Sequence, residues 1–439
     1  MSNNIVKKVI SLKKKEAESK KRNENEQAVI SVNNAFKASY GYLLTWGGLF
    51  RGSMLYSTFY VLWTGMHIGF LVYTVCISKN DLGILFEAAH FVVLLTNACL
   101  GVVNHRYHKD KIEFILKCIG DNFFDYGHTI DDELSEEIEQ IRKYRKEIKN
   151  FLATGFIIAI LFVGSFLTVA RPLYDIMVGT YFESDRSDGI VRTLPVAFWL
   201  PIQSEGIWVN IVAAFDEYYI IIGTAGIVLG VDISYLCFSH ELCTELEILG
   251  LTLKKFDQRA SFLYKFRYGT KLPKNMENDY HFNKCVEECL KESVKHHHLL
   301  LNYFNCHYTL NYIMLLALLL AATFMLCLSG FIFTSDGVLL SSKLTFLLFL
   351  ASELCHTFIF CWYGEQIYQM NNNLGDELYR SKWTHYSKTV KNYILIMQAR
   401  CNKPLRMSAG GFMEISLDTY SNVVSSAYSY FSLLRAIRE

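Results

Sequence analysis

Residues Met407 to Glu439 read MSAGGFMEISLDTYSNVVSSAYSYFSLLRAIRE, and this stretch decides the fold. Its part from Phe412 to Leu434 is long enough to cross a bilayer, for which roughly 20 residues are needed. Small and polar side chains recur in it at steps of three and four residues and therefore share one helix face: Asp418, Ser421, Asn422, Ser425, Ser429 and Ser432. The opposite face is mainly apolar and aromatic: Tyr420, Val423, Val424, Ala427, Tyr430, Phe431 and Leu434. A spanning helix must hide such a polar stripe from lipid, against protein or against water.

The polar stripe has two interpretations. Small side chains let two helix backbones approach closely, so the stripe fits helix–helix packing. It equally fits the lining of a water-filled pore, where serines face hydrated ions. Spacing alone does not separate the two. Only Arg435 to Glu439 follow Leu434, so we expect no C-terminal segment for a soluble signalling partner.

Composition indicates a polytopic membrane protein. Of the 439 residues, 51% are hydrophobic and 15% aromatic, and the apolar residues gather in runs of about 20 between charged stretches. The net charge of +1 gives no reason to expect a nucleic-acid partner. The first apolar run begins near Ser53, too late for a secretory signal. Before it, the mixed basic and acidic segment Lys7–Arg22 predicts a solvated arm that touches anionic membrane lipid.

The apolar runs predict an all-α membrane protein with seven transmembrane helices: Ser53–Ser78, Leu82–Val103, Phe151–Ala170, Asn210–Phe238, Tyr308–Phe333, Leu344–Trp362 and Phe412–Leu434. Most of the 43 lysines and arginines lie in the N-terminal arm and in the loops after spans two, four and six. This pattern predicts a cytoplasmic N-terminus and an extracellular C-terminus. The chain then divides into a cytoplasmic N-terminal arm (1–52), spans one to four (53–238), a cytoplasmic helical loop (239–307), spans five and six (308–363), cytoplasmic anchor helices (364–411) and the last span (412–434).

The cytoplasmic segments are predicted to be helical. Leu246–Tyr264 and Phe282–Asn305 carry apolar residues at helical spacing. Only Gly364 weakens the helix after Trp362, so we expect span six to continue through Glu365–Leu378. Together these pieces predict an anchor bundle below the membrane. All twelve cysteines lie in predicted spans or cytoplasmic segments, so no structural disulfide is expected.

The sequence contains no motif of an enzyme or cofactor site, such as a glycine-rich phosphate loop, a hydrolase elbow or paired zinc-finger cysteines. We therefore expect no enzymatic activity, no cofactor and no metal. The nearest approach to a metal site lacks the tight ligand set of zinc and is predicted to be cytoplasmic helix surface: Cys285, Cys289, His296, His297, His298, Cys306 and His307.

Five ionisable residues lie at membrane depth, where burial is costly: Glu87, His90, Asp232, Glu353 and His356. They fit either polar contacts in the protein interior or the proton relay of a transporter. A transporter would also need broken central helices, and none of the five prolines lies inside a predicted span. We therefore favour interior contacts.

Aromatic and apolar residues in the external halves of spans two, three, four and six predict a ligand pocket. A pocket with this lining suits a small apolar molecule with one weak polar handle. Aromatics at helical spacing also occur in plain cores and in lipid contacts, so each residue is a hypothesis based on depth. The candidates are His90, Phe91, Leu94, Phe162, Gly164, Phe166, Thr168, Phe215, Tyr219, Ile222, Phe346 and Phe349.

Several short motifs resemble the C-terminal signature of insect odorant receptors. In order, they are Leu378-Tyr379-Arg380-Ser381-Lys382-Trp383, Lys403-Pro404-Leu405, Ser408-Ala409-Gly410-Gly411-Phe412 and Ser429-Tyr430-Phe431-Ser432-Leu433-Leu434. A stretch further upstream resembles the loop before that family's fourth span: Leu194-Pro195-Val196-Ala197-Phe198-Trp199-Leu200-Pro201. Elsewhere the likeness is limited to topology and length.

The resemblance implies a tetrameric, ligand-gated, non-selective cation channel, with volatiles bound among the four helices named above and the last helix around the pore. It implies pore and gate residues at Ser425, Ser429, Ser432, Leu433, Ala436 and Ile437. Leu433 lies four residues beyond Ser429, so spacing points to the same face, and apolar rings can gate by dewetting. Arg435 and Arg438 put positive charge near the exit, which fits cation flow only if they point away from the axis or are offset by Glu439 and a partner subunit.

The family comprises ligand-specific receptors and one shared co-receptor, Orco, which has a longer loop between spans four and five and a different chain end. The short loop and the ending Ser432-Leu433-Leu434-Arg435 resemble the ligand-specific class. This implies a small volatile hydrophobic odorant as ligand and a heterotetramer with Orco in the plasma membrane of an olfactory neuron dendrite. Two other hypotheses are a secondary transporter and a seven-span receptor that signals through a soluble partner.

Overall fold

The structure, a computed structural model, is helical apart from two short hairpins in the part of the chain that it describes, which confirms the prediction of an all-α fold. It describes residues 33–34, 41–46, 48–50, 52–78, 81–178, 189–192, 194–201, 207–269, 271–273, 276–381 and 383–438. The predicted basic arm Lys7–Arg22 lies outside these residues.

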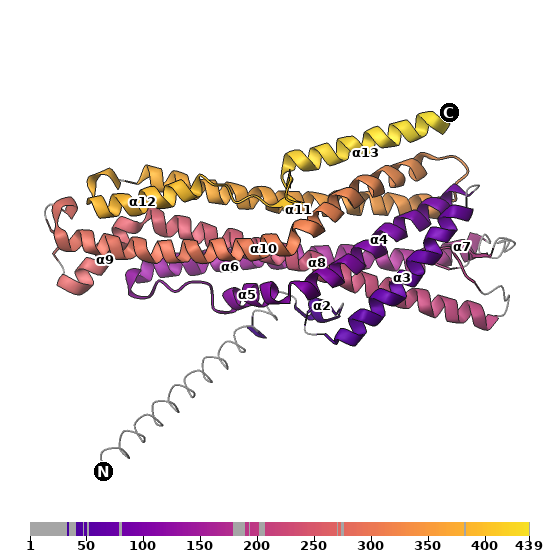
Figure 1. Cartoon of the computed structure of the whole chain (residues 1–439), viewed down its shortest axis with the longest axis horizontal. Helices are drawn as coiled ribbons and strands as arrows, with labels where there is room; N and C mark the ends of the chain where they lie inside the picture. The colour runs from indigo at the N-terminus through magenta and orange to yellow at the C-terminus, as the bar shows by residue number, and fades with distance from the viewer. Residues whose placement is uncertain are drawn as a thin grey trace, which may run out of the picture.

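The helices run mostly along the long axis of the molecule (Figure 1). In the first half of the chain they are α2 (Gly41–Trp46), α3 (Met54–Ile77), α4 (Leu82–Tyr107), α5 (Lys109–Gly120), η1 (Gly127–Thr129), α6 (Asp132–Ser165), the π-helical turn η2 (Phe166–Ala170) and α7 (Arg171–Val178). In the second half they are α8 (Ile207–Lys254), α9 (Phe256–Tyr268), η4 (Met276–Asn278), α10 (Tyr280–Thr334), α11 (Leu340–Arg380), η5 (Trp383–His385), α12 (Lys388–Cys401) and α13 (Leu417–Arg438).

Short polar side chains start several of these helices. Asp81, Asp131 and Asp279 each accept a hydrogen bond from the backbone N–H three residues on, at 3.2, 3.0 and 2.7 Å.

Between Tyr280 and Thr334 the sequence has no proline and one glycine, so α10 continues as one helix of 55 residues. The predicted continuation of span six is likewise confirmed, because α11 runs unbroken past Gly364 to Arg380.

Six described helical stretches are long and apolar enough to cross a membrane: Met54–Ile77, Leu82–Tyr107, Asp132–Val178, Ile211–Lys254, Tyr280–Thr334 and Leu340–Arg380. They match the first six predicted spans: four contain the whole predicted span, and Met54–Ile77 and Ile211–Lys254 differ from theirs by a single residue where they fall short. Helix α13 has 22 residues, a length of about 33 Å at 1.5 Å per residue, which is enough to cross a bilayer. Because of its polar stripe, however, it is less apolar than the six stretches above. The seventh span therefore stays a prediction.

The long helices pack in two regions. One, which we call the distal bundle, contains α5, α9, α12 and the adjoining halves of α6, α8, α10 and α11; it extends from α5 near the middle of the molecule to α9 and α12 at one end (Figure 1). The other holds α3, α4, η2 and the remaining halves of α8, α10 and α11. The hairpin of β1 (Ile190–Val191) and β2 (Phe198–Trp199) packs on this second region through Val191 and Phe198.

A second hairpin joins the distal bundle to the last helix. Its strands β3 (Ser408–Ala409) and β4 (Met413–Glu414) pair antiparallel, so the prediction that the last helix begins at Phe412 is wrong. The turn glycines Gly410 and Gly411 have φ of +61° and +83°, a conformation that favours glycine and folds the chain back before α13 can start. The N–H of Gly410 donates to the carbonyl of Tyr312 at 2.8 Å and fixes the hairpin on α10.

Candidate functional site

Helix α13 lies along the outside of the molecule, against α10 and α11 (Figure 1). Val423 and Ala427 are buried in this contact, and Tyr420, Val424, Phe431 and Leu434 are partly buried. The apolar face predicted from the sequence is thus the packing face, except that Tyr430 is exposed.

The polar stripe of α13 points away from the rest of the chain. Asp418, Ser421 and Asn422 are exposed, and so are all six predicted pore and gate residues: Ser425, Ser429, Ser432, Leu433, Ala436 and Ile437. Ser429 and Ser432 donate back to the carbonyls of Ser425 and Tyr428 at 2.9 Å each, which satisfies their hydroxyl protons within the helix. Helix–helix packing within this chain therefore does not explain the stripe.

Four of the twelve predicted pocket residues come together between α4 and α11, and we call them the aromatic cluster: His90, Phe91, Phe346 and Phe349. The His90 ring stacks on Phe349 with centroids 4.2 Å apart and an angle of 13°. His90 is 3% exposed, and its Nδ1 has no hydrogen-bond partner among the described residues. A buried ring nitrogen without a partner is costly and marks a polar position within an apolar wall.

Eight predicted pocket residues do not join this cluster. Phe215 is 74% exposed and Phe162 is 60% exposed, and Tyr219 and Ile222 also face outward. Leu94 packs partly buried on the same core, while Gly164, Phe166 and Thr168 are half-buried. Sequence depth fixes the level of a residue along a helix but not its rotation, so neighbours of these residues face the core instead: Leu167, Ala213 and Ile220.

Four of the five predicted intramembrane ionisable groups, all except His90, lie beside an ionisable partner within the protein. Glu87 receives hydrogen bonds to both carboxylate oxygens from the guanidinium of Arg171. His356 of α11 has its Nε2 3.2 Å from Asp232 Oδ2 and its Nδ1 3.7 Å from Glu353 Oε1. These contacts agree with the interpretation as interior polar contacts.

Two adjacent acids in α8, Asp216 and Glu217, are not among the ionisable residues predicted from the sequence. Asp216 accepts from Trp63 Nε1, and its other oxygen lies 2.8 Å from His67 Nε2. Glu217 is buried and accepts from the N–H of Val196 at 2.5 Å, but its Oε2 has no partner in the described part of the chain. The sequence does contain a signal for these two residues, because both acids interrupt an apolar run, where a charged residue is costly and usually has a role.

Most of the cysteine and histidine series of α10 lies in the protein interior, so its prediction as helix surface is wrong for these residues: Cys285, Cys289, His296 and His307 are fully buried, whereas His298 is exposed. His296 Nδ1 lies 2.7 Å from the Tyr126 hydroxyl and its ring stacks on Phe124, because the segment after α5 folds over α10. Within the described residues, no group of three or more His, Cys, Asp or Glu is placed to hold a metal ion.

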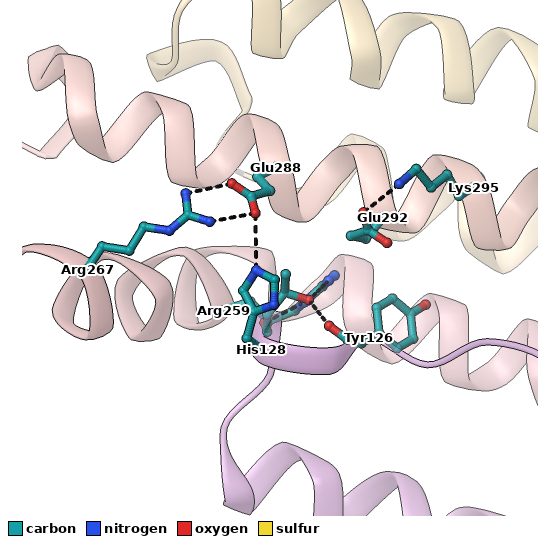
Figure 2. Close-up of polar contacts among 8 residues, drawn as sticks. Tyr126, His128, Arg259, Arg267, Glu288, Glu292 and Lys295 are labelled. Atoms are coloured by element: carbon teal, nitrogen blue, oxygen red, sulfur yellow. Dashed lines mark hydrogen bonds and ion pairs between the residues drawn. The ribbon is translucent and has the colours of Figure 1, made fainter. Parts of the chain in front are cut away.

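Charged contacts hold the same segment on the distal bundle. Figure 2 shows Glu288 of α10 between Arg267 of α9 and His128 of η1, with both guanidinium contacts at 2.7 Å. The hydrogen-bonded carboxylate raises the pKa of Arg267. Arg259 is fully buried beneath the Tyr126 ring, 4.7 Å from its centroid, and donates to Thr129 and Ser293. These contacts stabilise the fold of the distal bundle and do not form a reactive site.

Comparison with known proteins identifies the family. The family model described as 7tm Odorant receptor matches residues 86–428. The chain belongs to the insect odorant receptor family. Odorant receptor 13a of Drosophila melanogaster is 21% identical to this receptor over 409 residues, which are 88% of this chain and 90% of that protein. The odorant receptor coreceptor of Aedes aegypti matches over 120 residues at 27% identity, 27% of this chain and 25% of that protein.

A solved structure shares the fold of this receptor. The olfactory receptor OR5 of Machilis hrabei, determined in complex with eugenol, superimposes with a TM-score of 0.71 at 14% identity, over 93% of this chain and 99% of that one. The resemblance drawn from the C-terminal motifs is therefore confirmed at the level of family and fold. The family consists of odorant receptors and not of enzymes, and this receptor is a multi-span membrane protein.

Proposed function

We propose that this receptor is the ligand-specific subunit of a heteromeric, odorant-gated, non-selective cation channel. A small volatile hydrophobic odorant binds beside the aromatic cluster in the outer half of the membrane. Helix α13 lines a central pore together with α13 helices of other subunits, and the co-receptor Orco completes the heterotetramer. The channel lies in the plasma membrane of an olfactory neuron dendrite. Its N-terminus and distal bundle face the cytoplasm, an orientation that the distribution of lysine and arginine favours.

The observation that carries this proposal is the uncovered polar face of α13. A helix that spans a membrane cannot leave an aspartate, an asparagine and a row of serines in lipid. Because α10 and α11 cover only the opposite face, the stripe needs water or another subunit beside it. A pore shared between subunits supplies water on one side of the stripe and a neighbouring subunit beside it. Leu433, at the outer end of the stripe, is the proposed apolar gate.

Packing offers a route from ligand to pore. Phe431 and Leu434 of α13 contact the same core that contains Phe346 and Phe349 of the aromatic cluster. An odorant that binds more tightly when α13 has moved outward would shift the population toward the open state by its difference in affinity for the two states.

The test is whole-cell current in cells that express the receptor with and without Orco, under a panel of volatile esters, terpenes, alcohols and aldehydes. We expect current only when both subunits are present, and a change in relative ion permeability with Leu433→Ala. Leu434→Ala is the matched control, because its side chain lies partly buried on the packing face. A complex that reaches the surface and binds a volatile but stays electrically silent would contradict the proposal.

A further inference from the structure

A cavity of about 280 Å³ lies between α6, α8 and α11, at the boundary between the spanning helices and the distal bundle. Pockets for drug-sized ligands measure roughly 300–1,000 Å³, so this one has room for a small polar group and not for a large ligand. Each of the three helices contributes three lining residues: Tyr144, Arg145 and Ile148 from α6, His240, Cys243 and Glu247 from α8, and Trp362, Tyr363 and Gln366 from α11.

The inner wall of the cavity is held by hydrogen bonds. His240 Nε2 lies 2.8 Å from the carbonyl oxygen of Arg145 and must donate to it, since a carbonyl only accepts. In the neutral ring Nδ1 is then the acceptor, and it takes the hydroxyl proton of Tyr363 at 3.0 Å. One histidine thus ties α6 to α11 across α8, and the wall groups His240, Cys243 and Tyr363 are all buried.

The rim of the cavity, in contrast, carries donors that the protein does not use. Tyr144 Oη, Trp362 Nε1 and the Gln366 amide have no hydrogen-bond partner within the described residues. Arg145 donates Nε and Nη2 to Glu247 Oε2, which leaves Nη1 without a partner there. The unused N–H and O–H protons of these four groups outnumber the unused acceptor atoms of the lining side chains, which are Glu247 Oε1, the Gln366 amide oxygen and the Tyr144 hydroxyl oxygen. An occupant must therefore be rich in acceptors.

The charges that line the cavity balance each other, and the nearby cations that attract an anionic acceptor are exposed lysines. Arg145 and Glu247 neutralise each other, and Lys149 of the same helix pairs with Glu241 at 2.6 Å. Lys143 and Lys146, which flank Tyr144 and Arg145 in the sequence, are exposed, and so is the single acid Glu147 beside them. A phosphate group presents several acceptor oxygens and negative charge, which matches a guanidinium, an indole, an amide and a hydroxyl with lysines nearby.

The level of the cavity along the helices indicates where such a phosphate comes from. The apolar run of α8 ends at Phe238, that of α11 ends at Trp362, and that of α6 begins at the exposed Phe151. Tryptophan and tyrosine concentrate at the headgroup level of membranes, where one end of the ring is apolar and the other is wet. We propose that this cavity binds the phosphate headgroup of a membrane phospholipid, whose acyl chains lie along the apolar surface beside Phe151.

The test measures lipid that the receptor–Orco complex retains after purification, by native mass spectrometry. The probes are dioleoyl phosphatidylglycerol and dioleoylglycerol, which share acyl chains and differ in the phosphate. We expect selective retention of the phospholipid, and about tenfold less of it in Tyr144→Phe/Gln366→Leu, which removes two donors at nearly constant volume. The matched control is Tyr379→Phe/Gln398→Leu, the same two changes on residues that do not line the cavity.

Equal retention by the double variant, or of the lipid without phosphate, would overturn the proposal. Displacement of the lipid by inorganic phosphate would overturn the membrane as the source while supporting phosphate recognition. If the double variant does not assemble, Gln366→Leu alone decides, with an expected loss of about threefold. Lipid retention needs neither odorant nor current, so its failure leaves the channel proposal untouched.

Discussion

The ring of Phe431 on α13 lies over Gly330 of α10, where a Cβ atom would stand 3.6 Å from the ring. The next residue, Phe331, is buried in the core that also contains Phe346 and Phe349, and its ring is 5.3 Å from that of Phe86 on α4. The last helix therefore contacts α10 and α11 directly, and Phe331 of α10 connects it to α4, so α13 is coupled by packing to both helices that carry the aromatic cluster.

Phe431→Ala is expected to reduce the maximal odorant-evoked current while surface expression is kept. Full burial of a phenylalanine side chain contributes roughly 1.5–3 kcal/mol, and a half-buried one about 1 kcal/mol, which is a change of about fivefold in a gating equilibrium. The measurement is a dose–response curve in cells that express Orco. Tyr430→Ala removes an exposed ring from the adjacent position and serves as control. Identical curves for both variants and the wild type would show that the contact does not transmit gating.

Gly364→Ala is expected to destabilise the receptor by about 1–3 kcal/mol. A Cβ at this position in α11 would lie 2.4 Å from the carbonyl oxygen of Ile415, so the hairpin before α13 must move. Helix propensity works in the opposite direction and favours alanine by about 1 kcal/mol. The measurement is the thermal unfolding midpoint of purified receptor. Gly69→Ala isolates the propensity effect, because nothing lies within 4 Å of its added Cβ. A midpoint for Gly364→Ala at or above that of Gly69→Ala would contradict the packing described here.

Local sequence patterns correctly predicted the features that depend on residues close together in the chain. The polar and apolar faces of α13 follow from its helical period alone, and the absence of proline after Trp362 predicted that α11 continues. The start of α13 was misplaced because the turn at Gly410 and Gly411 depends on its hydrogen bond to Tyr312, a contact distant in sequence.

The candidate ligand site was predicted less well, for a geometric reason. His90 and Phe349 face each other only because α4 and α11 pack with a particular rotation about their axes, and a single sequence does not contain that rotation. Phe215 and Phe162 lie at comparable depth and face outward. The same limitation hid the burial of His296, since the segment that covers it comes from the distant residues after α5.

His90→Phe is expected to separate odorants by chemistry. The substitution keeps a ring stacked on Phe349 but removes the unpartnered Nδ1. If the odorant binds at the aromatic cluster, an alcohol that hydrogen-bonds to this nitrogen should lose about tenfold in potency, while a hydrocarbon of the same shape should keep its potency. Phe215→Ala, at an exposed position of α8, should change neither. Parallel shifts for both odorants would exclude His90 as the polar handle.

Cysteine substitution tests whether the exposed stripe of α13 faces water or lipid. A water-soluble, charged thiol reagent reacts with thiolates, which form in water and not in hydrocarbon. We expect Ser429→Cys to be modified from outside in the open channel, with block of current, on the order of 100-fold faster than Val423→Cys on the buried face. All twelve native cysteines are free, and Cys76 and Cys355 are exposed, so the rate in the unmodified receptor is subtracted as background. A Ser429→Cys receptor that conducts normally but never reacts would place the stripe against protein or lipid, and α13 would no longer account for ion flow.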